Sequence, residues 1–507
     1  MKKTADIWGI SVKIISSIID VIAPYLAIVF NNCINRGVFP DLLKHSKITP
    51  IFKSGCSSDP NNYRPVWVLP TLSKIFEKII LSQMLTYFNS HKLLHLKQFG
   101  FTRGRSTTDA GVELIKNIFD AWEESQSALG IFCDLSKAFD CVQHSTLVRK
   151  LYHYGIKGTS LDLLTSYLNN RIQRVDVNGR RSPGTPLSMG VPQGSILGPF
   201  LFLIYINDLP NLIEKKHKVV LFADDTSLIF KVKRNQTMYD EVNDILSDIV
   251  YWFRANNLLL NSKKTKFIKF TVPNVKNVNS NVLLNGEVIE PVESAIFLGI
   301  TLDSKLQWGP HIEGLANRLS SAAYAVNKIR QLTDIDTARL VYFSYLHSIM
   351  SYGILLWGNA ADINTIFVLQ KRAIRAIYNL GPRESLRAKF KEINILTVAS
   401  QYILDNVMYV HRHISEFARN CHNHNVNTRN RHKLMMPTTR LSRVSKSFVG
   451  RCICFYNKIP ENVQNKGVTL FKRIVKKRLC GKGYHNINDF LNDTTDWEWS
   501  DRPQAIK

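Results

Sequence analysis

Apolar residues recur along the chain with two different spacings, one typical of strands and one typical of helices. Runs of β-branched and aromatic residues bounded by turn residues predict strands, and the clearest pair covers 219–222 and 228–230. Apolar residues three or four positions apart predict helices over 11–36, 239–257 and 311–378, and others that end near Tyr87, Trp122 and Leu209. Because both kinds of element occur, the pattern predicts an α+β protein.

The pattern also changes along the chain. The helix predicted over 11–36 ends at Gly37 with Pro40 just beyond, a typical helix stop. Strands, turns and helices then follow one another, including a short strand predicted over 296–303. Beyond this point the pattern is helical, and in the last region it is helical and basic. We therefore divide the chain into 1–45, 46–304, 305–385 and 386–507.

The composition indicates a globular protein that binds a polyanion. The chain has 507 residues with 45% hydrophobic content, enough for several domains or one large multi-lobed enzyme. Its formal net charge is +26, and nucleic acid is the usual partner of so basic a protein. A membrane surface is the second candidate.

The apolar stretches predict neither a membrane span nor a secretory signal. Asp20 and Pro24 interrupt the longest run, from Ile14 to Phe30. No uninterrupted apolar stretch with a small-residue cleavage site follows the basic residues near Met1. The eight cysteines are scattered and sparse for this length, which favours a reduced, intracellular protein.

Asp224 and Asp225 stand between two predicted strands, so we expect them at the tip of a hairpin. Adjacent carboxylates repel one another unless a cation lies between them. Hard oxygen ligands suit Mg²⁺, which is commonly shared with substrate phosphates. The pair therefore indicates a metal site for phosphoryl transfer, and the alternative is a solvated Asp-Asp turn.

Other stretches carry weaker signals. Phe99 and Phe101 alternate with Arg103 and Arg105, a mixture that suits stacking on bases and following a phosphate backbone. Two sets of residues are zinc candidates without a known ligand spacing, and their alternatives are surface histidines and buried thiols. These sets are His91 with His95, and Cys452, Cys454 and Cys480 with His485.

Seven motifs occur in one order along the chain: YRPVWVLPTLSKIFEKII, QFGFTRGRSTTDA, DLSKAFD, GVPQGSILGP, FADD, LNSKKT and FLGITLD. This ordered set resembles the reverse transcriptase of non-LTR (LINE-type) retrotransposons, most closely the jockey-like group, over about 45–305 and more weakly beyond. The resemblance implies a right-hand polymerase with fingers, an antiparallel-sheet palm, a helical thumb and a basic C-terminal region. It also implies RNA-directed DNA polymerase activity on an RNA template, a DNA primer and deoxynucleoside triphosphates.

The resemblance assigns the metal ligands of such an enzyme. Two Mg²⁺ ions, or Mn²⁺, are expected, since nucleotidyl transfer uses one ion at the attacking hydroxyl and one at the triphosphate. Asp134 and Asp224 are implied as bridging ligands, Asp225 lies closer to the primer, and the carbonyl of Leu135 contributes to the nucleotide metal. Asp140 is nearby, but we expect a role at a helix N-terminus for it.

The resemblance also implies a nucleotide site and a primer grip. Its members are Lys53 and Arg64 on the triphosphate, Phe139 beneath the sugar, Gln193 and Gly194 against the nucleotide, Lys264 as the acid for pyrophosphate, and Phe297, Leu298 and Gly299 at the primer end. For four of these positions a plainer interpretation stays open. Phe139 would then be a core residue, Lys264 a surface lysine, and Lys53 and Arg64 ordinary loop charges.

The chain departs from the family pattern in two ways. Residues 1–45 are too short for the endonuclease that precedes the polymerase in full elements, so we expect no nicking activity. Trp67 replaces a small polar residue and is expected to crowd the fingers. The rival interpretations are a catalytically silent nucleic-acid-binding remnant and a host-adopted polymerase with another template. We expect the protein in the nucleus, the cytoplasm or both, as a ribonucleoprotein.

Overall fold

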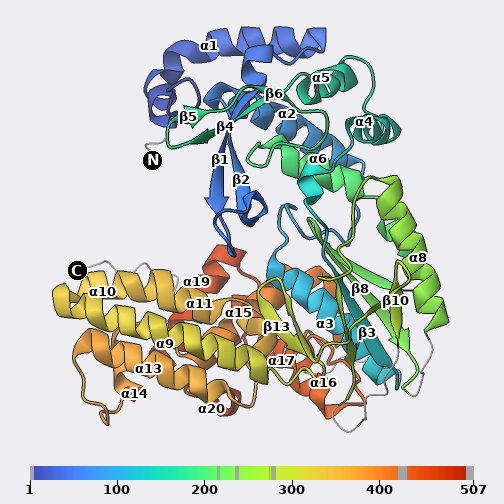
Figure 1. Cartoon of the computed structure of the whole chain (residues 1–507). Helices are drawn as coiled ribbons and strands as arrows, with labels where there is room; N and C mark the ends of the chain where they lie inside the picture. Colours follow the sequence, from blue (N-terminus) through green and yellow to red (C-terminus); the bar gives the residue numbers. More distant parts are fainter. Residues whose placement is uncertain are drawn as a thin grey trace.

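The computed structural model describes residues 5–213, 217–234, 239–272, 275, 281–420 and 431–497. Helices and strands are mixed in the first 300 residues, and helices alone make up the rest (Figure 1). The expectation of a mixed α and β fold is therefore confirmed.

A four-stranded antiparallel sheet lies at the centre of the first part. Its strands are β3 (Ser127–Cys133), β7 (Lys218–Phe222), β8 (Asp225–Val232) and β9 (Lys266–Phe270), in the order β7-β8-β3-β9. Cys133 pairs with Thr226, and Phe222 pairs with Asp225 across a two-residue turn. The end of β3 therefore lies beside the β7–β8 turn.

Both faces of this sheet are buried, and successive residues of one strand enter two different hydrophobic clusters. Leu129 and Ile131 of β3 pack into one cluster, whereas Ala128 packs into the other. Helix α3 (Thr107–Glu123) covers the second face, because Ser106 and Asp109 form a capping box and the helix buries an apolar stripe. Helices α4 (His144–His153), α5 (Thr159–Leu168), α6 (Leu197–Ile206), α7 (Pro210–Ile213) and α8 (Asp240–Ala255) lie on the first face.

A second sheet lies in the upper part of Figure 1. Its strands are β1 (His45–Phe52), β2 (Tyr63–Val68), β4 (Ile172–Val177), β5 (Arg180–Arg181) and β6 (Thr185–Pro186), in the order β2-β1-β4-β5 with β6 on β4. Helices α1 (Val12–Arg36) and α2 (Thr71–Ser90) and the short helices η1 (Asp41–Lys44) and η2 (Pro60–Asn62) accompany it. Strands β1 and β2 lead into and out of the loop that carries Lys53.

Helix α1 corrects one expectation from the sequence. It runs without interruption through Pro24, starts at a Ser11 cap and ends at Gly37 in the left-handed conformation. It has 25 residues, and its most apolar window of 18 residues has a mean hydropathy of 2.0 with 6% of that window buried. By length and composition it is therefore a candidate membrane span. A single such helix near the N-terminus is weak evidence for a span.

Two small hairpins connect the sheet to the helical half. They are β10 (Val282–Leu284) with β11 (Glu287–Ile289), and β12 (Ser294–Phe297) with β13 (Ile300–Asp303). The single strand predicted over 296–303 was wrong, because Leu298 and Gly299 both have positive φ and turn the chain back.

The helical half and the C-terminal region form one body. Its helices are α9 (Gly309–Leu332), α10 (Ile335–Val341), the π-helix η4 (Tyr342–His347), α11 (Ser348–Ser351), α12 (Ile354–Trp357), α13 (Ile363–Tyr378), α14 (Arg387–Glu392), α15 (Val398–Arg412), η5 (Ile414–Glu416), α16 (Ser442–Lys446), α17 (Phe448–Tyr456), α18 (Glu461–Gln464), α19 (Val468–Lys482) and α20 (Ile487–Asn492). One hydrophobic cluster extends from Phe99 to Phe490 and includes α3. The C-terminal region therefore packs on the same core as the helices before it.

Candidate active site

Three aspartates from separate elements lie at one end of the central sheet. Asp134 follows β3, Asp224 occupies the β7–β8 turn, and Asp225 opens β8. The strand register brings these positions together, as predicted for a hairpin tip beside a strand end. The backbone of Asp134 is fixed from the other side, because its carbonyl accepts a hydrogen bond from the Asn261 amide at 2.9 Å.

The three carboxylates influence one another's ionisation. Partial burial, together with the charges of Asp224 and Asp134, raises the pKa of Asp225 to about 6. Burial raises the pKa of Asp224, Asp134 raises it further, and Arg64 opposes the shift. Negative charge is therefore concentrated where a hard cation would relieve it.

The donor set fits divalent cations in chemical type. The carbonyl of Leu135 is an oxygen donor in addition to the carboxylates. The backbone pairing with 259–261 does not use it, because the two hydrogen bonds there run from Ser136 N–H to Leu259 and from Asn261 N–H to Asp134. Among the described residues, no three His, Cys, Asp or Glu side chains already form a closed metal-binding arrangement. The aspartates are therefore neighbours in the fold, and their side chains do not form a closed ligand set.

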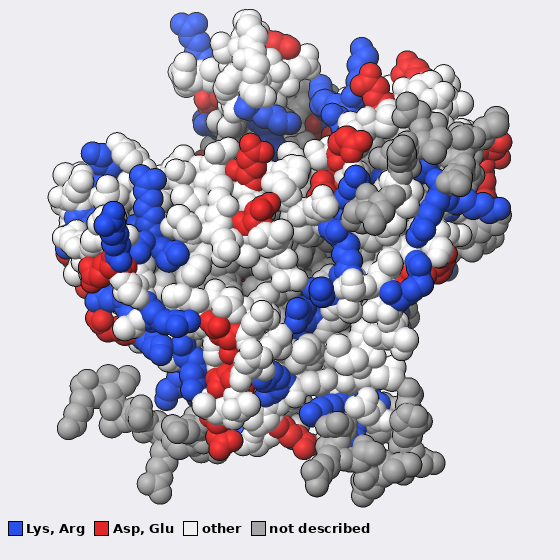
Figure 2. Space-filling model, turned by 90° about the horizontal axis from the view of Figure 1, so that it is seen from below, with Lys and Arg blue, Asp and Glu red and all other residues white. Residues whose placement is uncertain are grey.

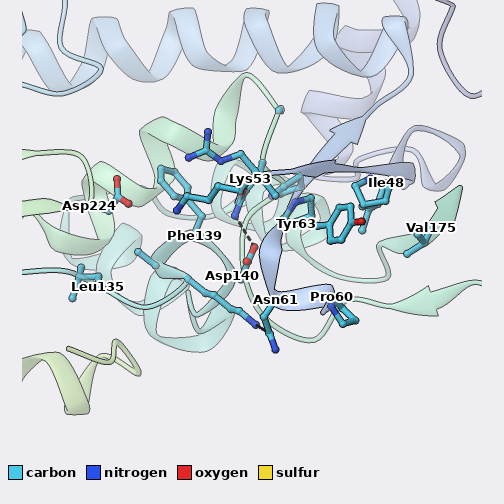
Figure 3. Close-up of a pocket in the computed structure, with 18 of the residues that line it drawn as sticks. Ile48, Lys53, Pro60, Asn61, Tyr63, Leu135, Phe139, Asp140, Val175 and Asp224 are labelled. Carbon is cyan, nitrogen blue, oxygen red and sulfur yellow. Dashed lines mark hydrogen bonds between the residues drawn. The ribbon is translucent and has the colours of Figure 1, made fainter. Parts of the chain in front are cut away.

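A cavity of about 1010 Å³ opens beside Asp224 (Figure 3). Its lining includes every residue predicted to bind nucleotide, and comes from both sheets and from the loop before α6. These residues are Lys53, Arg64, Leu135, Phe139, Gln193 and Gly194. Asp224 and Leu135 lie at one end of the cavity and Val175 at the other (Figure 3).

The ring of Phe139 belongs both to the cavity and to the core. It stacks on Phe202 with the ring centroids 4.5 Å apart, and it is half-buried. It also lines the cavity, so the ring has a contact with the core and a position beside the cavity.

Asp140 fixes the loop that carries Gln193. The Gln193 amide donates to the Asp140 carboxylate at 3.0 Å, and the Trp67 amide donates to the Gln193 carbonyl at 3.0 Å. Gly194 has φ of 121°, and a Cβ there would lie 2.7 Å from the Trp67 carbonyl, so glycine is required. Trp67 itself is buried behind the loop and does not line the large cavity.

The remaining predicted residues lie outside this cavity. The Lys264 ammonium is exposed and lies 3.9 Å from the Asp134 carboxylate, which brings it to the aspartates. Phe297 is buried and contacts the ring of Phe132, whereas Leu298 and Gly299 form the β12–β13 turn. Only the turn of this predicted primer grip is therefore accessible.

One buried residue that sequence reasoning missed supports the aspartate turn. The Gln98 side-chain oxygen accepts from the Ala223 amide at 3.1 Å and from the Gly100 amide at 2.8 Å. Ala223 has a positive φ of 56°, an unfavourable conformation for alanine that this bond helps to hold. Gln98 belongs to the motif QFGF, which the sequence analysis had singled out for its aromatic residues. In this motif Phe99 is buried and Phe101 is exposed, so the prediction that Phe99 stacks on bases was wrong.

A second missed residue supports the loop on the other side of the cavity. Glu77 of α2 is fully buried, and one of its carboxylate oxygens accepts from the amides of Ile196 at 2.7 Å and Leu197 at 3.2 Å. These amides begin α6, so Glu77 satisfies donors that the helix itself leaves free. A third, Lys137, lines the cavity and donates to Asn61 across it at 3.4 Å.

The zinc candidates from the sequence do not form a metal site. All seven described cysteines are free, and Cys133 and Cys452 are buried with pKa values raised to about 12. His485 packs on the rings of Phe367 and Phe390. Cys421 lies outside the described residues.

An antiparallel sheet that presents aspartates beside a cavity lined by cations and glycine loops is an arrangement typical of nucleotidyltransferases of the polymerase type. Residues 51–302 match the family described as "Reverse transcriptase (RNA-dependent DNA polymerase)", and this part of the chain belongs to it. The ordered motifs of the sequence had indicated this family, and that prediction is confirmed.

The similar proteins come from transposons. The chain is 30% identical to "Probable RNA-directed DNA polymerase from transposon BS" of Drosophila melanogaster over 438 residues, 83% of this chain and 47% of that protein. It is 30% identical to "RNA-directed DNA polymerase from mobile element jockey" of the same species over 365 residues, 70% of this chain and 40% of that protein. The chain thus spans less than half the length of these relatives.

Among solved structures, apo telomerase from Candida tropicalis truncated from its C-terminal domain overlaps with a TM-score of 0.39 at 12% identity. The overlap covers 53% of this chain and 55% of that one. A similarity this low adds nothing to the assignment of the fold.

Proposed function

We propose that this chain is the RNA-directed DNA polymerase of a non-LTR retrotransposon, which extends a DNA primer on an RNA template. The observation that carries the proposal is the cavity of about 1010 Å³, whose lining joins Asp224 to the cations Lys53 and Arg64. A silent nucleic-acid-binding remnant would have no need for this combination, since a basic surface alone binds nucleic acid.

In this proposal the aspartates hold two divalent cations. Asp134 and Asp224 are the shared ligands, Asp225 serves the primer side, and the carbonyl of Leu135 serves the nucleotide side. When bound, the ions lower the pKa of the primer hydroxyl and neutralise charge on the triphosphate. The raised pKa of about 6 at Asp225 supports this assignment, because burial and then the charges of Asp224 and Asp134 disfavour an ionised carboxylate that has no cation beside it.

The other residues orient the reactants. Lys53 and Arg64 bind the triphosphate, and Gln193 packs on the nucleotide in the orientation set by its bond to Asp140. Phe139 forms a wall beneath the sugar. Lys264 protonates the departing pyrophosphate, a role supported by its exposure and by its distance of 3.9 Å from Asp134.

The parts of the fold take the roles of a right-hand polymerase. The second sheet supplies the fingers, the four-stranded sheet the palm, and the helices of 305–385 the thumb. The Leu298–Gly299 turn, at the junction between sheet and helices, grips the primer end. The relatives' names support an element RNA as template, and nicked DNA would supply the primer in a ribonucleoprotein of the nucleus or cytoplasm.

Primer extension by the purified chain tests the proposal. We expect Mg²⁺-dependent extension of a labelled DNA primer annealed to RNA. Asp224→Asn should reduce extension to less than a few per cent and leave binding of the primer–template within about twofold, because it removes a metal ligand and no phosphate contact. The same result is expected for Asp134→Asn.

Asp248→Asn is a matched control, because this exposed aspartate lies on α8 away from the turn. It should extend primers like the unmodified chain. If the unmodified chain binds primer–template but never extends it, the protein is the silent remnant and the proposal fails.

A further inference from the structure

Tyr352 reaches from the helical half of the chain to the Leu298–Gly299 turn. Its hydroxyl donates a hydrogen bond to the Leu298 carbonyl at 2.6 Å, across 54 positions of sequence. Its ring also lies against Gly299, where an added Cβ would be 3.5 Å from it. One side chain therefore contacts both residues of the turn.

The turn itself is in an unfavourable conformation. Phe297 pairs with Ile300, so Leu298 and Gly299 form a two-residue hairpin loop, with φ of 46° and 80°. Two-residue loops with positive φ at both positions favour Asn or Asp followed by Gly. In this conformation Cβ lies too close to a backbone carbonyl oxygen, and the short polar side chains of Asn and Asp offset that cost with a local hydrogen bond. Leucine there costs free energy, and such a conformation persists only where surrounding contacts hold it.

Tyr352 is fixed in turn by the helices. The Trp357 indole donates to the Tyr352 carbonyl at 3.0 Å, and Gly353 follows with φ of 62°. A Cβ on Gly353 would lie 2.5 Å from the Ile300 side chain, so this backbone packs directly on β13. The anchor of the turn therefore lies at the junction between α11 and α12.

The position of this contact argues against a role in the hydrophobic core. Tyr352 is 40% exposed, and Gly299 is exposed. A hydrogen bond in such a place contributes at most about 1 kcal/mol to folding. Its geometry matters more, because it sets where the exposed carbonyls and amides of the turn point.

We propose that Tyr352 is a positioning residue for primer binding: its hydroxyl holds the Leu298–Gly299 turn in the conformation that receives the primer end. This inference rests on the proposed polymerase function. It links the helical half to the primer, so that displacement of the helices displaces the turn.

The test is Tyr352→Phe, which removes only the hydroxyl. In primer extension we expect the KM for primer–template to rise about fivefold to tenfold, while kcat at saturating primer–template and the KM for the nucleotide stay within twofold. Products should also shorten under conditions that allow a single encounter with the primer. Tyr345→Phe is the control, because Tyr345 is similarly exposed on the neighbouring π-helix, and its hydroxyl has no hydrogen bond within the described part of the chain.

Thermal unfolding of both variants separates positioning from folding, and the melting temperatures should agree within about 2 °C. A second variant tests the strained turn directly. Leu298→Asn places a residue that favours the turn conformation at this position. In that background the turn no longer needs the Tyr352 hydroxyl, so Tyr352→Phe should change the KM for primer–template by less than twofold.

An unchanged KM in Tyr352→Phe, or an equal rise in both backgrounds, would overturn the inference. Absence of extension by the unmodified chain would instead overturn the proposed function, so the two failures are distinguishable.

Discussion

At the scale of single residues, the site depends on side chains that have a structural contact on one side and an open cavity on the other. Phe139 shows this most clearly, since Phe202 stacks on one part of its ring and the cavity lies next to it. A ring held in this way is rigid, and a rigid ring excludes atoms more sharply than a mobile one. Discrimination against a ribonucleotide needs such a wall, because the two substrates differ by one hydroxyl.

We predict that Phe139→Val raises the use of ribonucleotides relative to deoxyribonucleotides at least about tenfold, or about 1.4 kcal/mol of lost discrimination. The smaller side chain leaves room for the 2′-hydroxyl. Stability should fall moderately, by about 1 kcal/mol, because a stacked aromatic pair is lost. The measurement is the ratio of kcat/KM values for the two nucleotides in single additions.

Phe202→Leu is the matched control for this change. It removes the same ring stacking from the fully buried side, so stability should fall, while the sugar preference should change much less than in Phe139→Val, because the Phe139 ring itself is still present beside the cavity. If Phe139→Val also keeps its sugar preference, Phe139 acts only as a core residue.

At the scale of elements, the loop before α6 is held by groups that lie far from it in the sequence. Glu77 binds the first amides of α6, Asp140 binds Gln193, and Trp67 binds the Gln193 carbonyl. Burial raises the pKa of Glu77, while the charge of Arg171 and the bonds from α6 oppose the shift. The Glu77 carboxylate lies at the N-terminus of α6, where the helix dipole favours negative charge.

We predict that Glu77→Ala lowers the free energy of unfolding by about 3 kcal/mol, because two buried amides lose their acceptor. The KM for the nucleotide should rise as the loop that carries Gln193 loosens. Urea unfolding and nucleotide titrations measure the two effects.

Ser73→Ala is the control, since the Ser73 hydroxyl donates to the other oxygen of Glu77 at 3.1 Å and does not contact α6. It should cost less than about 1 kcal/mol. A loss of stability in Glu77→Ala without any change in the nucleotide KM would show that the cap does not position the loop.

The elements show which features the sequence could predict. Periodicity predicted α3, α8 and the β7–β8 hairpin, because each has a long apolar pattern that its burial requires. The β12–β13 hairpin was missed, because its turn contains leucine where the rule expects asparagine or aspartate. The helix predicted over 11–36 is confirmed, but Asp20 and Pro24 were wrongly taken to exclude a stretch long and apolar enough to span a membrane.

The site divides in the same way. The nearness of Asp134 and Asp224 was predictable, because both belong to ordered motifs that place them at a strand end and at a hairpin turn. Gln98 and Glu77 were not, since their roles depend on which backbone amides lie beside them after folding. Sequence spacing holds no information about contacts between Gln98 and Ala223, which are 125 positions apart.

At the scale of the whole molecule, the net charge of +26 is spread and does not form a single patch on the face seen from below. Figure 2 shows separate groups of Lys and Arg on that face, with acidic side chains between some of them. Helix α19 contributes four exposed cations, Lys472, Arg473, Lys476 and Lys477. Arg478 differs, because its guanidinium is bound to Asp493 at 2.9 Å and serves the fold.

Affinity for primer–template should therefore fall steeply with salt. Each phosphate that the protein neutralises releases about one counterion, so we predict a log–log slope of affinity against salt steeper than about −2.

Reversal of charge in Lys476→Glu with Lys477→Glu should make this slope shallower, while single-nucleotide addition at saturating template is unchanged. The control is Lys78→Glu with Lys92→Glu, an equal change of charge at exposed lysines of and beside α2. Equal effects of the two pairs would mean that only the total charge matters, and a slope shallower than about −2 would mean that the charge serves another partner.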